Sequence, residues 1–242
     1  MENSIQFTNA SVWQKLYSEG KNDLRYPNDV LVRIGARLLD ASQHKKILDF
    51  GFGTGANLVH FASRGFEMYG VEVSEHAIAI TRERLCAAHL SAELHLIRAD
   101  EPLNFPSGAF DVVYAWQVIC YSDKAGWRFI VNELERVTRA GGLTIIATVA
   151  PGDIFQLQSQ GLGNSMYRLL IPGQEGCTIT IPEKHELADY FPGRQLNIGD
   201  FGFEFGGRAT HYWIVMYRTP QADNRTLVSV PADIQKSASL AA

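Results

Sequence analysis

The sequence predicts a doubly wound α/β fold with a mostly parallel sheet and helices on both faces. Through the first 150 residues, apolar runs typical of strands alternate five times with apolar residues at helical spacing, the order that produces parallel strands joined by crossover helices. The first run leads into a turn with glycine at every second position, residues 51–55, at the strand end where such sheets bind small molecules. Two β-rich runs flank Gly206-Gly207, which predicts a closing hairpin and one antiparallel strand.

The chain begins with a polar segment, residues 1–26, that carries the aromatic residues Phe7, Trp13, Tyr17 and Tyr26. We expect a short helix and a loop there, which form a lid segment in front of the main domain. The next helix begins at Pro27 or Asn28 and places three aliphatic side chains on one face, Leu31, Ile34 and Leu38.

Two strand–helix units follow this helix. Gly65 is suited to the left-handed position that ends a helix, and Ser74 is suited to the N-cap of the next one. We therefore expect strands over about 46–50 and 67–73, and helices over about 55–64 and 74–89.

The second half of the alternation contains the clearest helix, residues 123–139, which ends at Gly141-Gly142. Its apolar face consists of Trp127, Ile130, Val131, Leu134 and Val137. The run at 110–115 is almost continuously apolar, as expected of a strand covered on both faces. Further strands are expected over about 93–99 and 143–149.

The pattern changes after residue 150. Residues 150–193 contain several Gly and Pro and predict an irregular insertion with short helices, and the hairpin then uses 195–205 and 209–217. Polar residues 219–242 predict a flexible tail. The main domain is therefore expected to cover 27–218.

Composition excludes several classes of protein. The net charge of −4 gives no basic field for DNA or an anionic membrane, and no apolar run approaches the roughly 20 residues of a membrane span. The three cysteines are scattered, which argues against a disulfide framework or a zinc site. Residues 1–6 lack the features of a signal peptide, so we expect a cytoplasmic protein.

The glycine-rich turn has two interpretations. Residues 51–56 satisfy the dinucleotide pattern G-x-G-x-x-A, with Glu72 about 20 residues further on. The same turn, written as Asp49-x-Gly51-x-Gly53-x-Gly55, resembles the class I S-adenosylmethionine-dependent methyltransferase family. The resemblance covers about residues 45–150 and the closing hairpin. It implies a Rossmann-like sheet of seven strands with the last strand antiparallel.

Three observations favour the methyltransferase interpretation. An acid precedes the glycines in register, a second acidic pair follows the third strand, and the hairpin takes the place of a separate substrate domain. The resemblance implies that Asp49 holds the turn and the amino end of the cofactor. It also implies that Glu72 accepts both ribose hydroxyls and that Asp100, or alternatively Glu101, accepts from the adenine amino group. The predicted cofactor site is Asp49, Gly51, Phe52, Gly53, Gly55, Glu72, Val73, Asp100, Glu101, Trp116 and Gln117.

The end of the fourth strand narrows the acceptor. It reads Ala115-Trp116-Gln117, without the Asp or Asn followed by Pro-Pro and an aromatic residue that DNA-base methylases of this family carry, and no metal-ligand cluster follows. Trp116 or Tyr121 is placed to stabilise the sulfonium by a cation–π contact. The alternative is that both rings pack under the helix that begins at Asp123.

A hydroxyl or amine acceptor must lose a proton to a nearby base. The catalytic candidates are His185 in the insertion and Tyr17 and Tyr26 in the lid segment, with His211 in the hairpin also considered. We expect methyl transfer from S-adenosylmethionine to an oxygen or nitrogen atom of a small molecule, in a possible homodimer. The alternatives are a saccharide or lipid-linked acceptor, or a catalytically silent cofactor-binding module.

Overall fold

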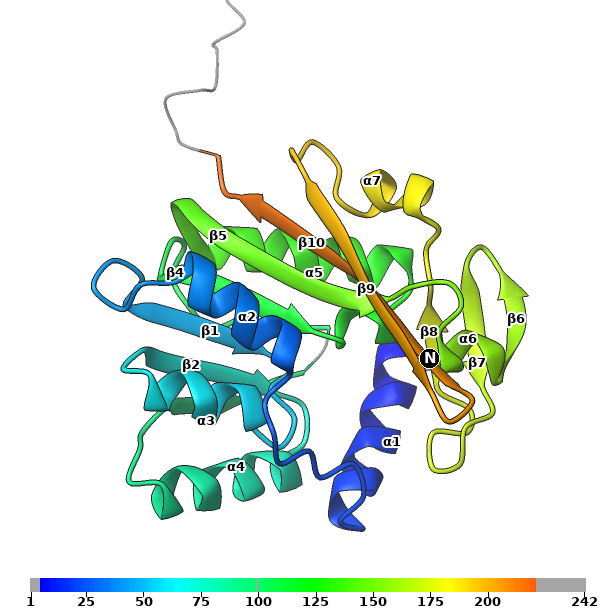
Figure 1. The fold of residues 1–242 in the computed structure, drawn as a ribbon, viewed down its shortest axis with the longest axis horizontal. Coiled ribbons are helices and arrows are strands. Elements are labelled where there is room, and N and C mark those ends of the chain that lie inside the picture. Colours follow the sequence, from blue (N-terminus) through cyan, green and yellow to red (C-terminus); the bar gives the residue numbers. More distant parts are fainter. Residues whose placement is uncertain (1–4, 99, 221–242) are drawn as a thin grey trace, which may run out of the picture.

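The structure is a computed structural model that describes residues 5–98 and 100–220. A seven-stranded sheet in the order β3-β2-β1-β4-β5-β10-β9 forms its centre (Figure 1). Strands β1 to β5 run parallel, and β10 pairs antiparallel with both β5 and β9, which confirms the expected sheet. The strands are β1 (Lys46–Phe50), β2 (Glu67–Glu72), β3 (Glu93–Leu96), β4 (Phe110–Trp116), β5 (Thr138–Val149), β9 (Asn197–Phe205) and β10 (Arg208–Arg218).

Helices cover both faces of this sheet because each presents an apolar stripe to it. On one face, α2 (Asp29–Leu38), α3 (Ala56–Ser63) and α4 (Glu75–Ala87) enclose a core that includes Leu31, Phe61 and Ile78. On the other face, α5 (Lys124–Val137) and α7 (Leu187–Tyr190) bury the predicted stripe around Trp127. Successive strand residues point to opposite faces, so Ile47 belongs to the first core and Leu48 to the second.

The predicted helix starts agree with the structure. The Asn28 side chain accepts from the backbone N–H groups of Val30 and Leu31 at the start of α2, and Ser74 accepts from Ala77 at the start of α4. The boundary after α5 differs from the prediction, because the chain enters β5 at Thr138 and Gly141 lies within that strand. The side chain of Thr138 is buried and donates to the Leu134 carbonyl oxygen. Thr138 is therefore both the C-cap of α5 and the first residue of β5.

The insertion is more regular than the sequence predicts. It forms a second antiparallel sheet in the order β6-β7-β8, with β6 (Ser159–Gly163), β7 (Met166–Leu169) and β8 (Thr178–Thr180). The short elements α6 (Ile154–Leu157) and η2 (Lys184–Glu186) flank it. This sheet exists because alternate apolar residues, Leu169, Ile179 and Ile181, are buried against Cys120 and Val149 near the end of the main sheet. Frequent glycines hide that pattern in the sequence.

The amino-terminal helix α1 (Ile5–Ser18) lies beside the small sheet, across the ends of the central strands (Figure 1). Asn9 fixes it there. Its buried side chain donates to the carbonyl oxygens of Tyr121 and Thr178, each at 2.7 Å, and accepts from the Thr178 N–H at 3.0 Å. The lid role of this segment stays a prediction, and its helix is anchored to β8 of the small sheet and to Tyr121, which follows β4.

The expected tail begins within a paired region, because Thr219 still exchanges backbone hydrogen bonds with Gly141 and Gly142. Residues 221–242 of that tail lie outside the described residues. Within the described ranges, no helix has the length and apolar character needed to span a bilayer.

Candidate functional site

A cavity of about 650 Å³ lies at the carboxyl ends of the central strands. Its walls come from two groups of elements. The ends of β1 and β2 and the glycine-rich turn form one half, which we call the cofactor half. Helix α1, the 150–193 insertion and the β9–β10 hairpin form the other, which we call the acceptor half. The two segments that interrupt the strand–helix alternation therefore meet at the strand ends where α/β sheets bind ligands.

The glycine-rich turn needs its glycines for backbone reasons. Gly51, Gly53 and Gly55 all have positive φ, at 73°, 56° and 79°, a region that side chains disfavour. Gly51 and Gly53 line the cavity together with Phe52. Gly55 does not line it. Gly55 instead precedes α3 and lies against Thr81, so its role is to pack the turn against α4.

Glu72 is the carboxylate that shapes this turn. It is 5% exposed, and its Oε2 accepts from the Gly53 N–H at 2.9 Å, while Oε1 accepts from Val73 at 2.8 Å and Ser74 at 3.1 Å. Burial raises its pKa, and these three N–H bonds oppose the rise. Glu72 and Val73 both line the cavity, as the predicted cofactor site requires.

Asp49 is the second buried carboxyl group of the cofactor half. It is 2% exposed, and its Oδ2 accepts from the Tyr114 hydroxyl at 2.7 Å. Strands β1 and β4 place the two residues directly opposite each other. Burial raises the pKa of Asp49 to about 8, an effect that the Tyr114 hydrogen bond reduces and the nearby Glu72 increases. Sequence reasoning missed Tyr114 because it lies within an apolar strand. The available signal was its hydroxyl, because a buried tyrosine hydroxyl needs a hydrogen-bond partner.

The end of β4 contributes to the cavity as predicted. Trp116 and Gln117 both line it, and Gln117 has a positive φ of 55°. Tyr121 lines it as well, and its ring stacks edge-on against Trp13 of α1 at 5.0 Å between centroids. The cation–π role of Trp116 or Tyr121 stays a prediction.

The tyrosines of the predicted lid have different positions. Tyr17 is buried, and its hydroxyl lies about 3.0 Å from where a Cβ at Gly53 would be. Burial and the charge of Glu72 raise the Tyr17 pKa well above its ordinary value, so its hydroxyl stays protonated. Tyr26 also lines the cavity but is 87% exposed, which places it at the mouth.

Besides Gly55, three predicted residues lie outside the cavity lining. Asp100 and Glu101 are exposed and pair with Arg98 at 3.6 Å and 3.0 Å, because β3 ends early, at Leu96, and lining from this segment stops at Ile97. The adenine role of Asp100 or Glu101 stays a prediction.

His185 is the third. It lies exposed on η2, where a capping box between Glu183 and Glu186 fixes the turn and the Trp213 indole N–H donates to the Pro182 carbonyl oxygen at 2.9 Å. These contacts hold His185 away from the cavity. His211 also lies outside the lining, with its Nδ1 2.7 Å from the Pro151 carbonyl oxygen.

Sequence reasoning missed Asp153, a buried carboxyl group of the acceptor half. It is the N-cap of α6 and accepts from Phe155 at 2.9 Å and from the His211 N–H at 2.7 Å. Burial raises its pKa. The signal available in the sequence was its position shortly after the end of a strand, here β5.

Known proteins resemble this chain in sequence and fold. Residues 47–142 match a model of a methyltransferase domain. The malonyl-[acyl-carrier protein] O-methyltransferase of Serratia marcescens is 28% identical over 174 residues, which cover 69% of this chain and 64% of that protein. The chain spans 24%, 64% and 55% of the length of three curated relatives that it matches.

Two solved structures share the fold. One, from work on the conversion of a disulfide bond into a thioacetal group during echinomycin biosynthesis, has a TM-score of 0.69 at 20% identity and covers 87% of this chain and 91% of its own. The other is an S-adenosylmethionine-dependent methyltransferase from Methanosarcina mazei, with a TM-score of 0.66 at 16% identity, covering 81% and 99%.

Residues 47–142 thus form a methyltransferase domain, and the chain is similar in sequence and fold to the class I S-adenosylmethionine-dependent methyltransferases.

The cofactor half fits S-adenosylmethionine, the cofactor of this methyltransferase family. Two buried carboxyl groups, Asp49 and Glu72, suit a ligand that carries ribose hydroxyls and a net positive charge. A dinucleotide would direct its pyrophosphate to the N–H groups of the turn, and the Gly53 N–H is already bonded to Glu72. Among the lining residues that the structure describes, none is Lys, Arg or His.

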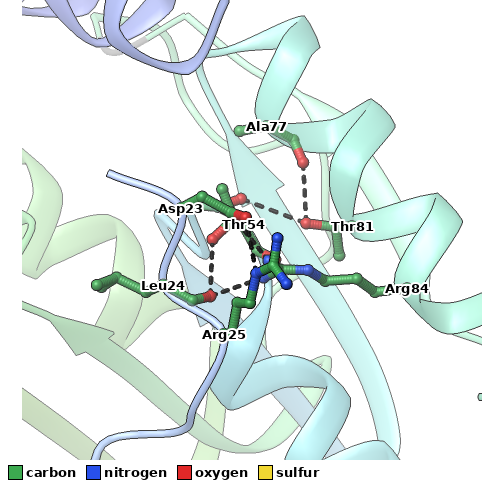
Figure 2. A network of polar contacts seen from close by, with 8 residues as sticks. Asp23, Leu24, Arg25, Thr54, Ala77, Thr81 and Arg84 are labelled. Carbon is green, nitrogen blue, oxygen red and sulfur yellow. Dashed lines mark hydrogen bonds and ion pairs between the residues drawn. The ribbon is translucent and has the colours of Figure 1, made fainter. Parts of the chain in front are cut away.

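A polar network ties this site to the lid segment (Figure 2). Arg84 of α4 donates to the carbonyl oxygens of Leu24 at 2.7 Å and Thr54 at 2.6 Å, and pairs with Asp23. The Thr54 hydroxyl also donates to Leu24 O at 3.1 Å. One guanidinium therefore holds both the linker after α1 and the glycine-rich turn.

The raised pKa of Asp49 predicts proton-linked binding of S-adenosylmethionine in this protein. A cationic ligand favours the carboxylate, so binding below pH 8 should release up to about one proton, and affinity should rise with pH until about pH 8. Calorimetry of S-adenosylmethionine binding at pH 7, in buffers of different ionisation enthalpy, measures that proton. Asp49→Asn keeps an acceptor for Tyr114 and should abolish most of the release. Equal release in both proteins would contradict this assignment.

The Arg84 network predicts a selective effect on the turn and the linker. Arg84→Ala removes charge-assisted bonds worth about 1.5–3 kcal/mol each, so hydrogen exchange at residues 22–28 and 51–55 should accelerate and cofactor affinity should fall several-fold. Arg82 is an exposed arginine on the same helix. Arg82→Ala is therefore the matched control and should change neither the hydrogen exchange nor the cofactor affinity. Identical exchange in the two variants would show that the network has no positioning role.

Proposed function

We propose that the protein transfers the methyl group of S-adenosylmethionine to an oxygen or nitrogen atom of a small-molecule acceptor by in-line displacement. The observation that carries the proposal is the single cavity that joins Asp49 and Glu72 at the ends of β1 and β2 to walls from α1, the insertion and the hairpin. Methyl transfer needs cofactor and acceptor in one shared space. The O-methyltransferase name of the Serratia relative supports oxygen as the acceptor atom; its malonyl substrate is not part of the proposal.

The protein's contribution to such a reaction is alignment and the exclusion of water. The bound cofactor supplies a methyl group activated by a positively charged sulfur. Holding the acceptor in line with that methyl group accounts for much of the rate of a displacement reaction. Trp13 stacks against both Tyr17 and Tyr121, with centroid distances of 5.6 Å and 5.0 Å, and these rings form a continuous wall of the cavity.

A base for the acceptor proton is best sought at Asp153. Tyr17 stays protonated because of its raised pKa, and His185 lies outside the cavity lining. Asp153 is a buried carboxyl group of the acceptor half, and burial raises its pKa towards the working range of a general base. We therefore propose Asp153 in place of His185 for proton removal.

Two alternatives lead to different results. A saccharide or lipid-linked acceptor would extend from the cavity past Tyr26 at its mouth. A catalytically silent module would bind the cofactor without turnover. The expected homodimer and the cytoplasmic location stay predictions.

The proposal predicts binding of S-adenosylmethionine and its demethylated product, no binding of NAD, and methylation of at least one neutral hydroxyl or amine compound. Calorimetry with each ligand measures the first two. A panel of acceptors incubated with methyl-labelled cofactor measures the third, with heat-denatured protein as the control. Tight NAD binding without a response to S-adenosylmethionine would overturn the assignment, and binding without any labelled product would favour the silent module.

A further inference from the structure

The acceptor half of the cavity has an unusual distribution of charge. Four acidic residues line the whole cavity, Asp29, Asp49, Glu72 and Asp153, and among the described lining residues there is no Lys, Arg or His. Asp29 has a partner outside the lining, Arg33 at 3.2 Å. Asp153 is the buried acid of the acceptor half: it lines the cavity and is 2% exposed.

Aromatic side chains form much of the remaining wall of the acceptor half, beside Asn9, Ile154, Gln174 and Thr210. Trp13 and Tyr121 lie on the side of α1, Phe155 on α6, and Phe201, Phe203 and Tyr212 on the hairpin. Phe203 is 55% exposed and extends this apolar surface to the rim. Such walls favour flat or extended apolar bodies through stacking and area burial.

No described cation is placed to compensate an anionic acceptor. The His211 ring is engaged by the Pro151 carbonyl oxygen and lies 3.7 Å from Asp200, outside the cavity lining. Arg84 is held by Asp23, Leu24 and Thr54, also outside that lining. A carboxylate or phosphate that entered would lose its hydration without a counter-charge and would face the Asp153 carboxylate.

We infer that the acceptor is a molecule without negative charge that has an aromatic or extended apolar body, and that carboxylate and phosphate acceptors are excluded. The inference rests on the proposed function for the existence of an acceptor, and it adds the chemical class of that acceptor. Discrimination arises from Asp153 and the absence of a cation, while the aromatic wall provides the affinity.

The test compares two probes of the same shape, 2-naphthol and 6-hydroxy-2-naphthoate, on the full chain saturated with the demethylated cofactor product. This product lacks the sulfonium charge, which would otherwise attract an anionic probe at the position of the transferred methyl group. Calorimetry at pH 8 should give at least about tenfold weaker binding of the carboxylate probe. Equal or tighter binding of the naphthoate would overturn the inference. Failure of both probes to bind would overturn it as well.

A pair of variants tests the location of the effect. Phe203→Lys places an ammonium group at the rim of the acceptor half. It should reduce the preference for 2-naphthol over the naphthoate, measured as the ratio of their dissociation constants, at least about threefold. Phe205→Lys adds the same charge two residues away, at a position 82% exposed and outside the lining, and should leave the preference unchanged. An equal change in both variants would show that net charge, and not the cavity, sets the preference.

Failure of the proposed function is read out separately. Methyl transfer to 2-naphthol is followed by mass spectrometry with S-adenosylmethionine in place of its product. The protein could show the predicted binding preference but transfer no methyl group to 2-naphthol or to other neutral acceptors. That result would contradict the proposed function and leave the inference on ligand class standing.

Discussion

The hydrogen bonds of the Glu72 carboxylate are the constraint on which the site depends. One carboxylate at the end of β2 accepts from Gly53 in the glycine-rich turn and from Val73 and Ser74 at the start of α4. It thereby joins the turn after β1 to the segment that leads from β2 into α4. Three N–H groups at the turn and strand ends would otherwise lack partners in a buried environment, at a cost of about 1–3 kcal/mol each. The same carboxylate lines the cavity, so loop shape and ligand recognition are coupled.

Other contacts extend this constraint to the acceptor half. Arg84 holds the linker after α1 against the turn, and Asn9 holds α1 against the end of β4 and the small sheet. Asp153 does the same for α6 and β10 by accepting from Phe155 and His211. Each polar side chain fixes segments that are distant in sequence, which is how an irregular set of elements forms one cavity.

The sequence was sufficient for the main sheet and for the backbone of the glycine-rich turn, because these depend on local signals: apolar period, helix caps and glycines at fixed spacing. It was insufficient wherever long-range contacts decide the outcome. The small sheet β6-β7-β8 is formed by burial against Cys120 and Val149, and His185 is directed outward by the turn that carries it. Asp153 and Tyr114 acquire their roles only through partners on other strands, so no spacing in the sequence reveals them.

The affinity of Glu72→Gln for S-adenosylmethionine tests the central claim most directly. Glutamine keeps one oxygen for Val73 and Ser74 but presents an amide N–H group to the Gly53 N–H and lacks the charge, so the dissociation constant should rise at least about tenfold. Glu75→Gln removes one charge from an exposed position on α4 and should bind as the unaltered protein does. Unchanged affinity in Glu72→Gln, measured by calorimetry on folded protein, would contradict the account.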